Sequence, residues 1–134
     1  MNAVDTNVLI YAHDPRDPVK QNQAVALIAS LTDGVLLWQV SCEYIAASRK
    51  LTAFGLSQSQ AFADLQRLRT VWRPAFPTWA MFDRAETLLA SGNLSFWDAL
   101  IVAACVENGV ARLYSEDFDA STSAITGVAI VNPF

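Results

Sequence analysis

Close to its start the chain reads VDTNVLIYA, from Val4 to Ala12, and this stretch indicates the class of fold. The apolar runs 3–4 and 8–10 form the pattern of a short buried strand that leads directly into a helix. Asp5 stands at the junction between the two runs. An isolated buried carboxylate is costly, so an acid at such a junction either caps the helix or belongs to a site.

Beyond this stretch, short apolar segments alternate with segments of helical periodicity. Strands are expected near residues 35–38, 71–76, 112–115 and 128–131, and helices near 19–31, 41–52, 57–69, 78–91 and 95–107. Turns rich in Pro, Gly, Asp or Asn separate these segments. The alternation predicts one α/β domain over residues 1–134, with three layers in which helices cover both faces of a short, mostly parallel, twisted sheet.

The composition is that of an apolar folded domain, with 53% hydrophobic and 16% charged residues and a net charge of −4. No apolar run approaches the roughly 20 residues that span a bilayer, and the start does not resemble a signal peptide. We therefore expect a cytoplasmic protein with no membrane partner, and we expect Cys42 and Cys105 to be buried free thiols. The excess of acids does not suit binding of nucleic acid by bulk charge, so such an enzyme would need metal ions or a local basic patch.

Three acids, Asp5, Glu43 and Asp98, interrupt apolar segments. Each has a local explanation: Asp5 can cap a helix, Glu43 lies near a helix start, and Asp98 follows Ser95 in the spacing of a capping box. Asp117 in turn follows a late strand. In a doubly wound sheet, residues after strands and in first helical turns converge at the carboxyl edge. Carboxylates crowded there repel one another, and a hard divalent cation such as Mg²⁺ or Mn²⁺ would relieve the repulsion.

Other chemistries lack their residues in this sequence. The only histidine, His13, lies in a proline-containing turn where we expect a surface residue, so no serine or cysteine has an evident base partner. Two cysteines and one histidine make a poor zinc set, and the five glycines are too scattered for a phosphate-binding loop. Acids that hold a divalent ion can instead support hydrolysis of a phosphodiester.

Four motifs resemble those of the PIN-domain family, and specifically its VapC-like toxins. They are VDTNVLIYA (Val4–Ala12), SCEY (Ser41–Tyr44), SFWDALIVAA (Ser95–Ala104) and LYSEDF (Leu113–Phe118). The resemblance extends over the whole chain in length and in the order of elements. It implies a PIN domain that acts as a Mg²⁺- or Mn²⁺-dependent endoribonuclease on single-stranded RNA.

The resemblance also implies the residues of the site. The acids that would bind metal are Asp5, Asp98, Glu43 and Asp117. The residues that would orient a ligand or a water are Thr6, Asn7 and Ser115. The fourth acid stays open, because the turn after the last motif offers Glu116, Asp117 and Asp119.

The same resemblance implies a homodimer and a cognate antitoxin protein that neutralises the toxin. We expect the apolar residues of the segment 41–69 to divide between the core and an antitoxin groove, with Phe54 and Phe62 among the antitoxin contacts. Three other functions stay open. They are a receiver domain, which would need a lysine after Lys50, a PIN scaffold that only binds, and a nuclease for structured DNA, for which the chain is short.

Overall fold

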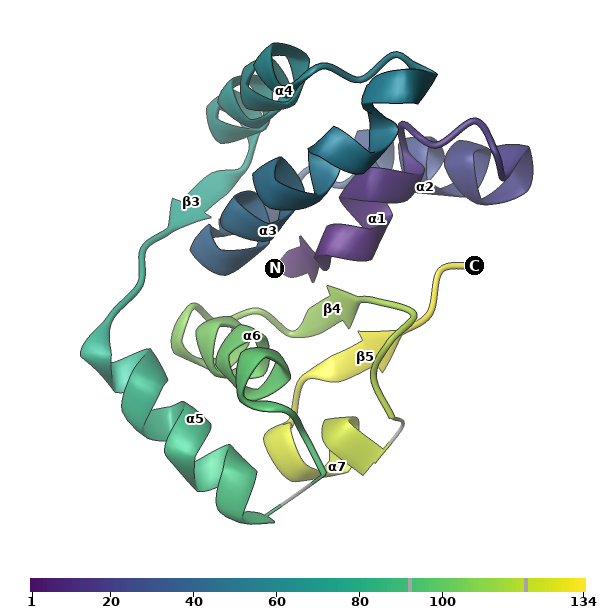
Figure 1. The fold of residues 1–134 in the computed structure, drawn as a ribbon. Coiled ribbons are helices and arrows are strands. Elements are labelled where there is room, and N and C mark those ends of the chain that lie inside the picture. The colour runs from purple at the N-terminus through teal and green to yellow at the C-terminus, as the bar shows by residue number, and fades with distance from the viewer. Residues whose placement is uncertain (92, 120) are drawn as a thin grey trace.

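The computed structural model describes residues 1–91, 93–119 and 121–134 and shows a sheet with helices on both sides (Figure 1). The strands are β1 (Asn2–Val4), β2 (Gly34–Leu37), β3 (Arg73–Ala75), β4 (Arg112–Tyr114) and β5 (Ala129–Val131). The α-helices are α1 (Thr6–Tyr11), α2 (Pro18–Ser30), α3 (Trp38–Ser48), α4 (Gln58–Val71), α5 (Trp79–Ser91), α6 (Phe96–Glu107) and α7 (Ser121–Thr126), and η1 (Arg49–Phe54) is a 3₁₀ helix. The strand order is β3-β2-β1-β4-β5 and every described pair is parallel, which confirms the predicted α/β class.

The order in which strands are added to the sheet reverses between β1 and β4. From β1 it proceeds to β2 and β3 on one side, and it then crosses back to β4 and β5 on the other. Because connections between parallel strands are right-handed, α1 to α4 cover one face and α5 to α7 the other, which are the upper and lower groups of Figure 1. The carboxyl ends of β1 and β4 therefore flank the switch point, where α/β sheets bind their ligands.

The centre of the core lies between β2 and α6. All residues of β2 are buried, and α6 buries Ala99 and the run 101–105. At Gly34 the core leaves no room for a side chain, since a Cβ there would overlap the indole of Trp72. That indole is itself fixed, because its Nε1 donates a hydrogen bond to the carbonyl of Leu31 at 3.1 Å. Gly34 is thus required by packing, and its φ is not in the left-handed region.

The structure differs from the predicted helices in two places. The third helix begins at Trp38, directly after β2, and not at Ser41, because its buried positions Val40, Tyr44 and Ser48 follow a four-residue spacing that starts before Ser41. No side chain caps this helix, so the sequence carries no start signal there. The short helix α7 was not predicted, since its sequence STSAIT has no apolar periodicity.

Burial of the segment 41–69 follows the expected division between core and surface. Tyr44, Leu51, Leu56 and Leu65 are buried, whereas Phe54 and Phe62 are exposed. The two cysteines are free thiols, and Cys105 is buried as expected. Cys42 is exposed on α3, which corrects the expectation that both thiols are buried.

Candidate active site

Asp5 lies where β1 ends and α1 begins, and both of its carboxylate oxygens accept hydrogen bonds. One oxygen accepts from the backbone N–H of Thr6 at 2.7 Å, which is the helix cap that the sequence suggests. The other accepts from the hydroxyl of Ser115 at 2.7 Å, at the end of the neighbouring strand β4. Asp5 is only 6% exposed. It therefore serves as a cap and also faces the switch point of the sheet.

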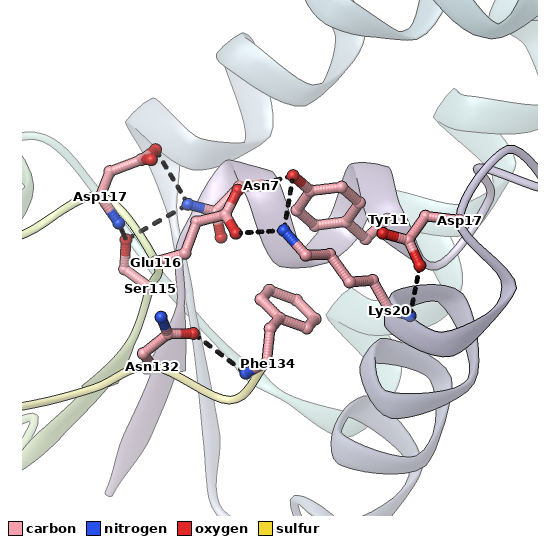
Figure 2. A network of polar contacts seen from close by, with 9 residues as sticks. All are labelled: Asn7, Tyr11, Asp17, Lys20, Ser115, Glu116, Asp117, Asn132 and Phe134. Atoms are coloured by element: carbon pink, nitrogen blue, oxygen red, sulfur yellow. Dashed lines mark hydrogen bonds and ion pairs between the residues drawn. The ribbon is translucent and has the colours of Figure 1, made fainter.

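Asn7 and the turn after β4 extend this cluster, as Figure 2 shows. The amide nitrogen of Asn7 donates to a carboxylate oxygen of Asp117 at 3.0 Å and to the hydroxyl of Ser115 at 3.3 Å. The backbone N–H of Asp117 also donates to the Ser115 hydroxyl, at 3.1 Å. Ser115 is 1% exposed and so joins Asp5, Asn7 and Asp117 from below the surface.

Glu43 approaches the same place from α3. One of its oxygens accepts from the hydroxyl of Thr6 at 2.7 Å, and the other accepts from the side-chain amide of Gln39 at 2.6 Å. The Gln39 amide nitrogen also donates to the backbone carbonyl of Trp97 at 3.1 Å. Gln39 thus joins the start of α3 to the start of α6, where Asp98 follows Trp97.

Asp98 lies in the first turn of α6, where Ser95 is the N-cap and accepts a hydrogen bond from the backbone N–H of Asp98 at 3.1 Å. Burial raises the pKa of Asp98, the hydrogen bond with Ser95 opposes the rise, and the charges of Asp117 and Glu43 add to it. Ser95 therefore caps the helix as the spacing predicts, but no hydrogen bond from the Ser95 N–H to the Asp98 carboxylate completes a capping box among the described residues. The Asp98 carboxylate is close enough to Asp117 and Glu43 to be affected by their charge.

Burial and, to a smaller extent, the crowding of like charge disfavour the ionised form of Asp5. Burial raises its pKa to about 6; the hydrogen bonds from Ser115 and Thr6 oppose this shift, and the charges of Glu43 and Asp117 add to it. Among the described residues, none of the ion pairs formed by Lys, Arg, His or the N-terminus involves one of the four predicted acids. The acids therefore gather without a counter-charge from those groups.

Of the three acids after β4, only Asp117 contacts the cluster. Glu116 accepts from the Tyr11 hydroxyl at 2.6 Å and pairs with Lys20 at 2.8 Å, on the side facing α1 and α2 (Figure 2). Asp119 accepts from the backbone N–H of Ser121 at 3.0 Å, at the start of α7. The geometry thus favours Asp117 among the alternatives that the sequence left open.

The donor set suits a hard divalent cation, although it is not a closed cage. The side chains around the cluster offer carboxylate, hydroxyl and amide oxygens, which Mg²⁺ and Mn²⁺ prefer. The side-chain oxygen of Asn7 is buried without a hydrogen-bond partner among the described residues. Within the same part of the chain, no three His, Cys, Asp or Glu side chains already stand close enough to hold one ion together. Thr6 and Ser115 instead contact the carboxylates individually.

Sequence reasoning missed Gln39, Lys20 and Tyr11. Gln39 precedes Glu43 by four residues, a spacing that pairs side chains on one helix face, but the helix was expected to start after it.

His13 was expected at the surface, but it is half-buried, with its Nε2 2.9 Å from an oxygen of Asp64. Its partner is thus an acid, Asp64.

Comparison with known families identifies the fold. A model of the PIN domain matches residues 3–124, a range that includes all four predicted acids. The chain belongs to the PIN domain family. No curated protein sequence matches this PIN domain.

No helix of the described residues is both long and apolar enough to cross a membrane.

Solved structures share the architecture of this PIN domain over nearly its full length. A toxin–antitoxin complex from Klebsiella pneumoniae has 20% identity and a TM-score of 0.71, over 100% of this chain and 98% of that chain. VapC20 from Mycobacterium tuberculosis, a sarcin–ricin loop cleaving toxin, has 23% identity and a TM-score of 0.70, over 93% of this chain and 95% of that chain. VapBC-1 from nontypeable Haemophilus influenzae has 14% identity and a TM-score of 0.66, over 98% and 97%. At these identities the likeness shows the fold.

Proposed function

We propose that this PIN domain is a Mg²⁺- or Mn²⁺-dependent endoribonuclease that cleaves single-stranded RNA, and that it is the toxin of a toxin–antitoxin pair. The observation that carries the proposal is the gathering of acids where the carboxyl ends of β1 and β4 meet the helices α3 and α6; the charges of Glu43 and Asp117 there add to the raised pKa values of both Asp5 and Asp98. Carboxylates placed together without a pairing cation are suited to bind one. The RNA that such a toxin would cleave lies in the cytoplasm, where we expect the protein to act.

In this proposal the metal ligands are Asp5, Asp98, Glu43 and Asp117. When bound, the ion would activate a water and stabilise charge at the phosphate. The Ser115 hydroxyl would hold one oxygen of Asp5 in place, and the Thr6 hydroxyl would do the same for Glu43. Groups that orient ligands in this way affect metal affinity strongly. Asn7 would hold Asp117 at the edge of the site.

The choice of RNA rests on the family and on the charge of the chain. One structural neighbour is named as a sarcin–ricin loop cleaving toxin, and a loop in RNA offers unpaired nucleotides. The net charge of −4 means that long-range attraction cannot hold the substrate. We therefore expect binding of a short RNA segment at the acidic cluster, with bound cations offsetting the phosphate charge.

The cleavage test compares the purified wild type with Asp5→Asn and Asp98→Asn on a mixed pool of single-stranded RNA, with Mn²⁺ and with EDTA. Asp83→Asn is the matched control, since it makes the same change of charge at an exposed position on α5. We expect cleavage only with Mn²⁺, retained in the control and lost in both site variants. Cleavage that survives both site substitutions, or that persists in EDTA, would refute the proposal.

We also propose that an antitoxin contacts α3, η1 and α4. Several structural neighbours are toxin–antitoxin complexes. Phe54 and Phe62 are 43% and 51% exposed, which leaves two aromatic side chains for a partner helix. Charge substitutions at both positions should abolish co-purification with the co-expressed antitoxin while the circular dichroism spectrum stays unchanged. Intact binding in the folded double variant would exclude this surface.

A second copy of the chain is proposed to pack on an aromatic face around β3. This face consists of Trp38, Phe76, Trp79 and Phe82, which are 55%, 66%, 79% and 48% exposed. All four line one cavity of about 380 Å³. A stable dimer needs about 800 Å² of buried surface per partner, and large side chains provide it efficiently. Light scattering should find a dimer for wild type and for Ile125→Glu, a control on α7, and a monomer for Trp79→Glu; a dimeric Trp79→Glu would exclude the face.

A further inference from the structure

The turn after β4 sends its consecutive side chains in different directions. Ser115 contacts Asp5, and Asp117 contacts Asn7, so both belong to the acidic cluster. Glu116, between them, contacts neither and instead meets residues of α1 and α2 (Figure 2). A carboxylate therefore lies next to the cluster in sequence but is held outside it.

Lys20 holds Glu116 there. Its ammonium is 2.8 Å from one oxygen of Glu116, while the other oxygen accepts from the Tyr11 hydroxyl at 2.6 Å. Lys20 also donates to the Tyr11 hydroxyl at 3.3 Å. The backbone N–H of Lys20 donates to Asp17, which caps α2. The ion pair is thus joined to two helices and to the turn after β4.

The surroundings of Lys20 distinguish this contact from an ordinary surface ion pair. The ammonium lies 4.6 Å from the centre of the Tyr11 ring and 5.5 Å from that of Phe134. The two rings are themselves in edge contact at 4.9 Å. The side chains of Lys20 and Glu116 are 31% and 22% exposed, so water screens the pair only in part. Such an arrangement restrains Glu116 more firmly than a flexible exposed pair would.

Release of Glu116 would affect the site through the backbone of the turn. The turn would lose its contact with Tyr11 and Lys20, while Ser115 and Asp117 would keep theirs. The backbone N–H of Asp117 donates to Ser115 within the same turn, so the direction of the Asp117 carboxylate depends on that backbone. A less restrained turn would hold Asp117 less firmly toward a cation and would weaken the binding of that cation.

We propose that Lys20 is a positioning residue of the site: with Tyr11 it retains Glu116 outside the acidic cluster, so that the turn presents Asp117 to the cluster. Lys20 does not touch the reacting atoms, and it acts through Glu116. The effect on metal binding rests on the proposed function, whereas the restraint on the turn does not. The closing experiment therefore measures the two separately.

The experiment uses Lys20→Met, which removes the charge and keeps a long apolar side chain, and Lys20→Arg, which keeps the charge. Lys50→Met is the matched control, because Lys50 is the other lysine of the chain and is exposed on η1. Glu116→Gln and the double variant with Lys20→Met test whether the two residues act together. Hydrogen exchange of the Asp117 amide reports on the turn, and calorimetric titration with Mn²⁺ reports on the site.

We expect faster exchange of the Asp117 amide in Lys20→Met, and exchange like that of wild type in Lys20→Arg and Lys50→Met. Mn²⁺ affinity should fall about tenfold in Lys20→Met, the low end for groups that orient metal ligands, and should stay like that of wild type in Lys20→Arg and Lys50→Met. In the double variant the loss should be no larger than in Lys20→Met, since both substitutions break the same contact. Unchanged exchange in Lys20→Met would overturn the proposal. Faster exchange with unchanged Mn²⁺ affinity would overturn the positioning role. If Lys20→Met exchanges faster but the wild type itself binds no Mn²⁺, the restraint on the turn is supported and the proposed function is refuted.

Discussion

Replacement of Asp5 by asparagine should stabilise the metal-free protein at neutral pH. The fold raises the pKa of Asp5 from 3.8 to about 6, so the native state binds this proton more tightly than the unfolded chain does. The group therefore lowers the free energy of unfolding as the pH rises from about 4 to 6, and the whole penalty is present above that range. The two pKa values give a penalty of about 3 kcal/mol at pH 7.5 and about 1 kcal/mol at pH 4.5.

The assay is urea denaturation of wild type and Asp5→Asn in EDTA at both pH values. Asparagine can still accept the hydrogen bond of the Thr6 N–H, but the contact with Ser115 changes, which adds an effect that does not depend on pH. The difference in free energy of unfolding between the two proteins is measured at each pH, and subtracting one difference from the other removes that effect. We expect the variant to gain about 2 kcal/mol relative to wild type between pH 4.5 and 7.5. An equal difference between the two proteins at both pH values would show that the fold does not raise the pKa of Asp5.

Three further predictions concern packing, proton affinity and metal binding. Gly34→Ala should lower the free energy of unfolding by about 1–3 kcal/mol in urea denaturation, because its Cβ would overlap the Trp72 indole; unchanged stability would show that Trp72 moves freely. With Mn²⁺ held well below its Kd, cleavage should decrease as the pH falls through about 6, because protons then compete with the ion for Asp5; Ser115→Ala should shift this limb of the pH–rate profile to higher pH by removing a hydrogen bond that lowers the pKa of Asp5. An unshifted profile would show that the hydrogen bond from Ser115 does not lower the pKa of Asp5. Mn²⁺ at 100 times its Kd should raise the free energy of unfolding of wild type by about 2.7 kcal/mol, and of Asp98→Asn by much less; equal gains would exclude Asp98 as a ligand.

The sequence predicts the fold well because strand and helix signals agree over most of the chain. The run Val4–Ala12 and the apolar helix over 96–107 have strong periodicity and clear caps at Asp5 and Ser95. The start of α3 could not be found in the same way, because no side chain caps it and only packing against the core fixes it. The short helix α7 likewise follows from its place beside β5 and not from its own sequence.

The candidate site could be predicted in its acids but not in their partners. Asp5, Glu43 and Asp98 are conspicuous because charge is unusual in apolar segments. The contacts of Gln39 and Lys20 depend on how separate elements come together, which periodicity does not encode. The choice of Asp117 over its neighbours likewise needed the direction in which each side chain leaves the turn.

We propose that the four acids together bind a divalent ion, and the measurement to make is anomalous diffraction from crystals soaked in Mn²⁺. We expect a strong anomalous peak between β1 and α6, within coordination distance of the carboxylates of Asp5 and Asp98 and next to Glu43 or Asp117. Crystals of Asp98→Asn should lose this peak. If saturating Mn²⁺ binds only elsewhere on the protein and gives no peak at the acidic cluster, these acids are not the metal site.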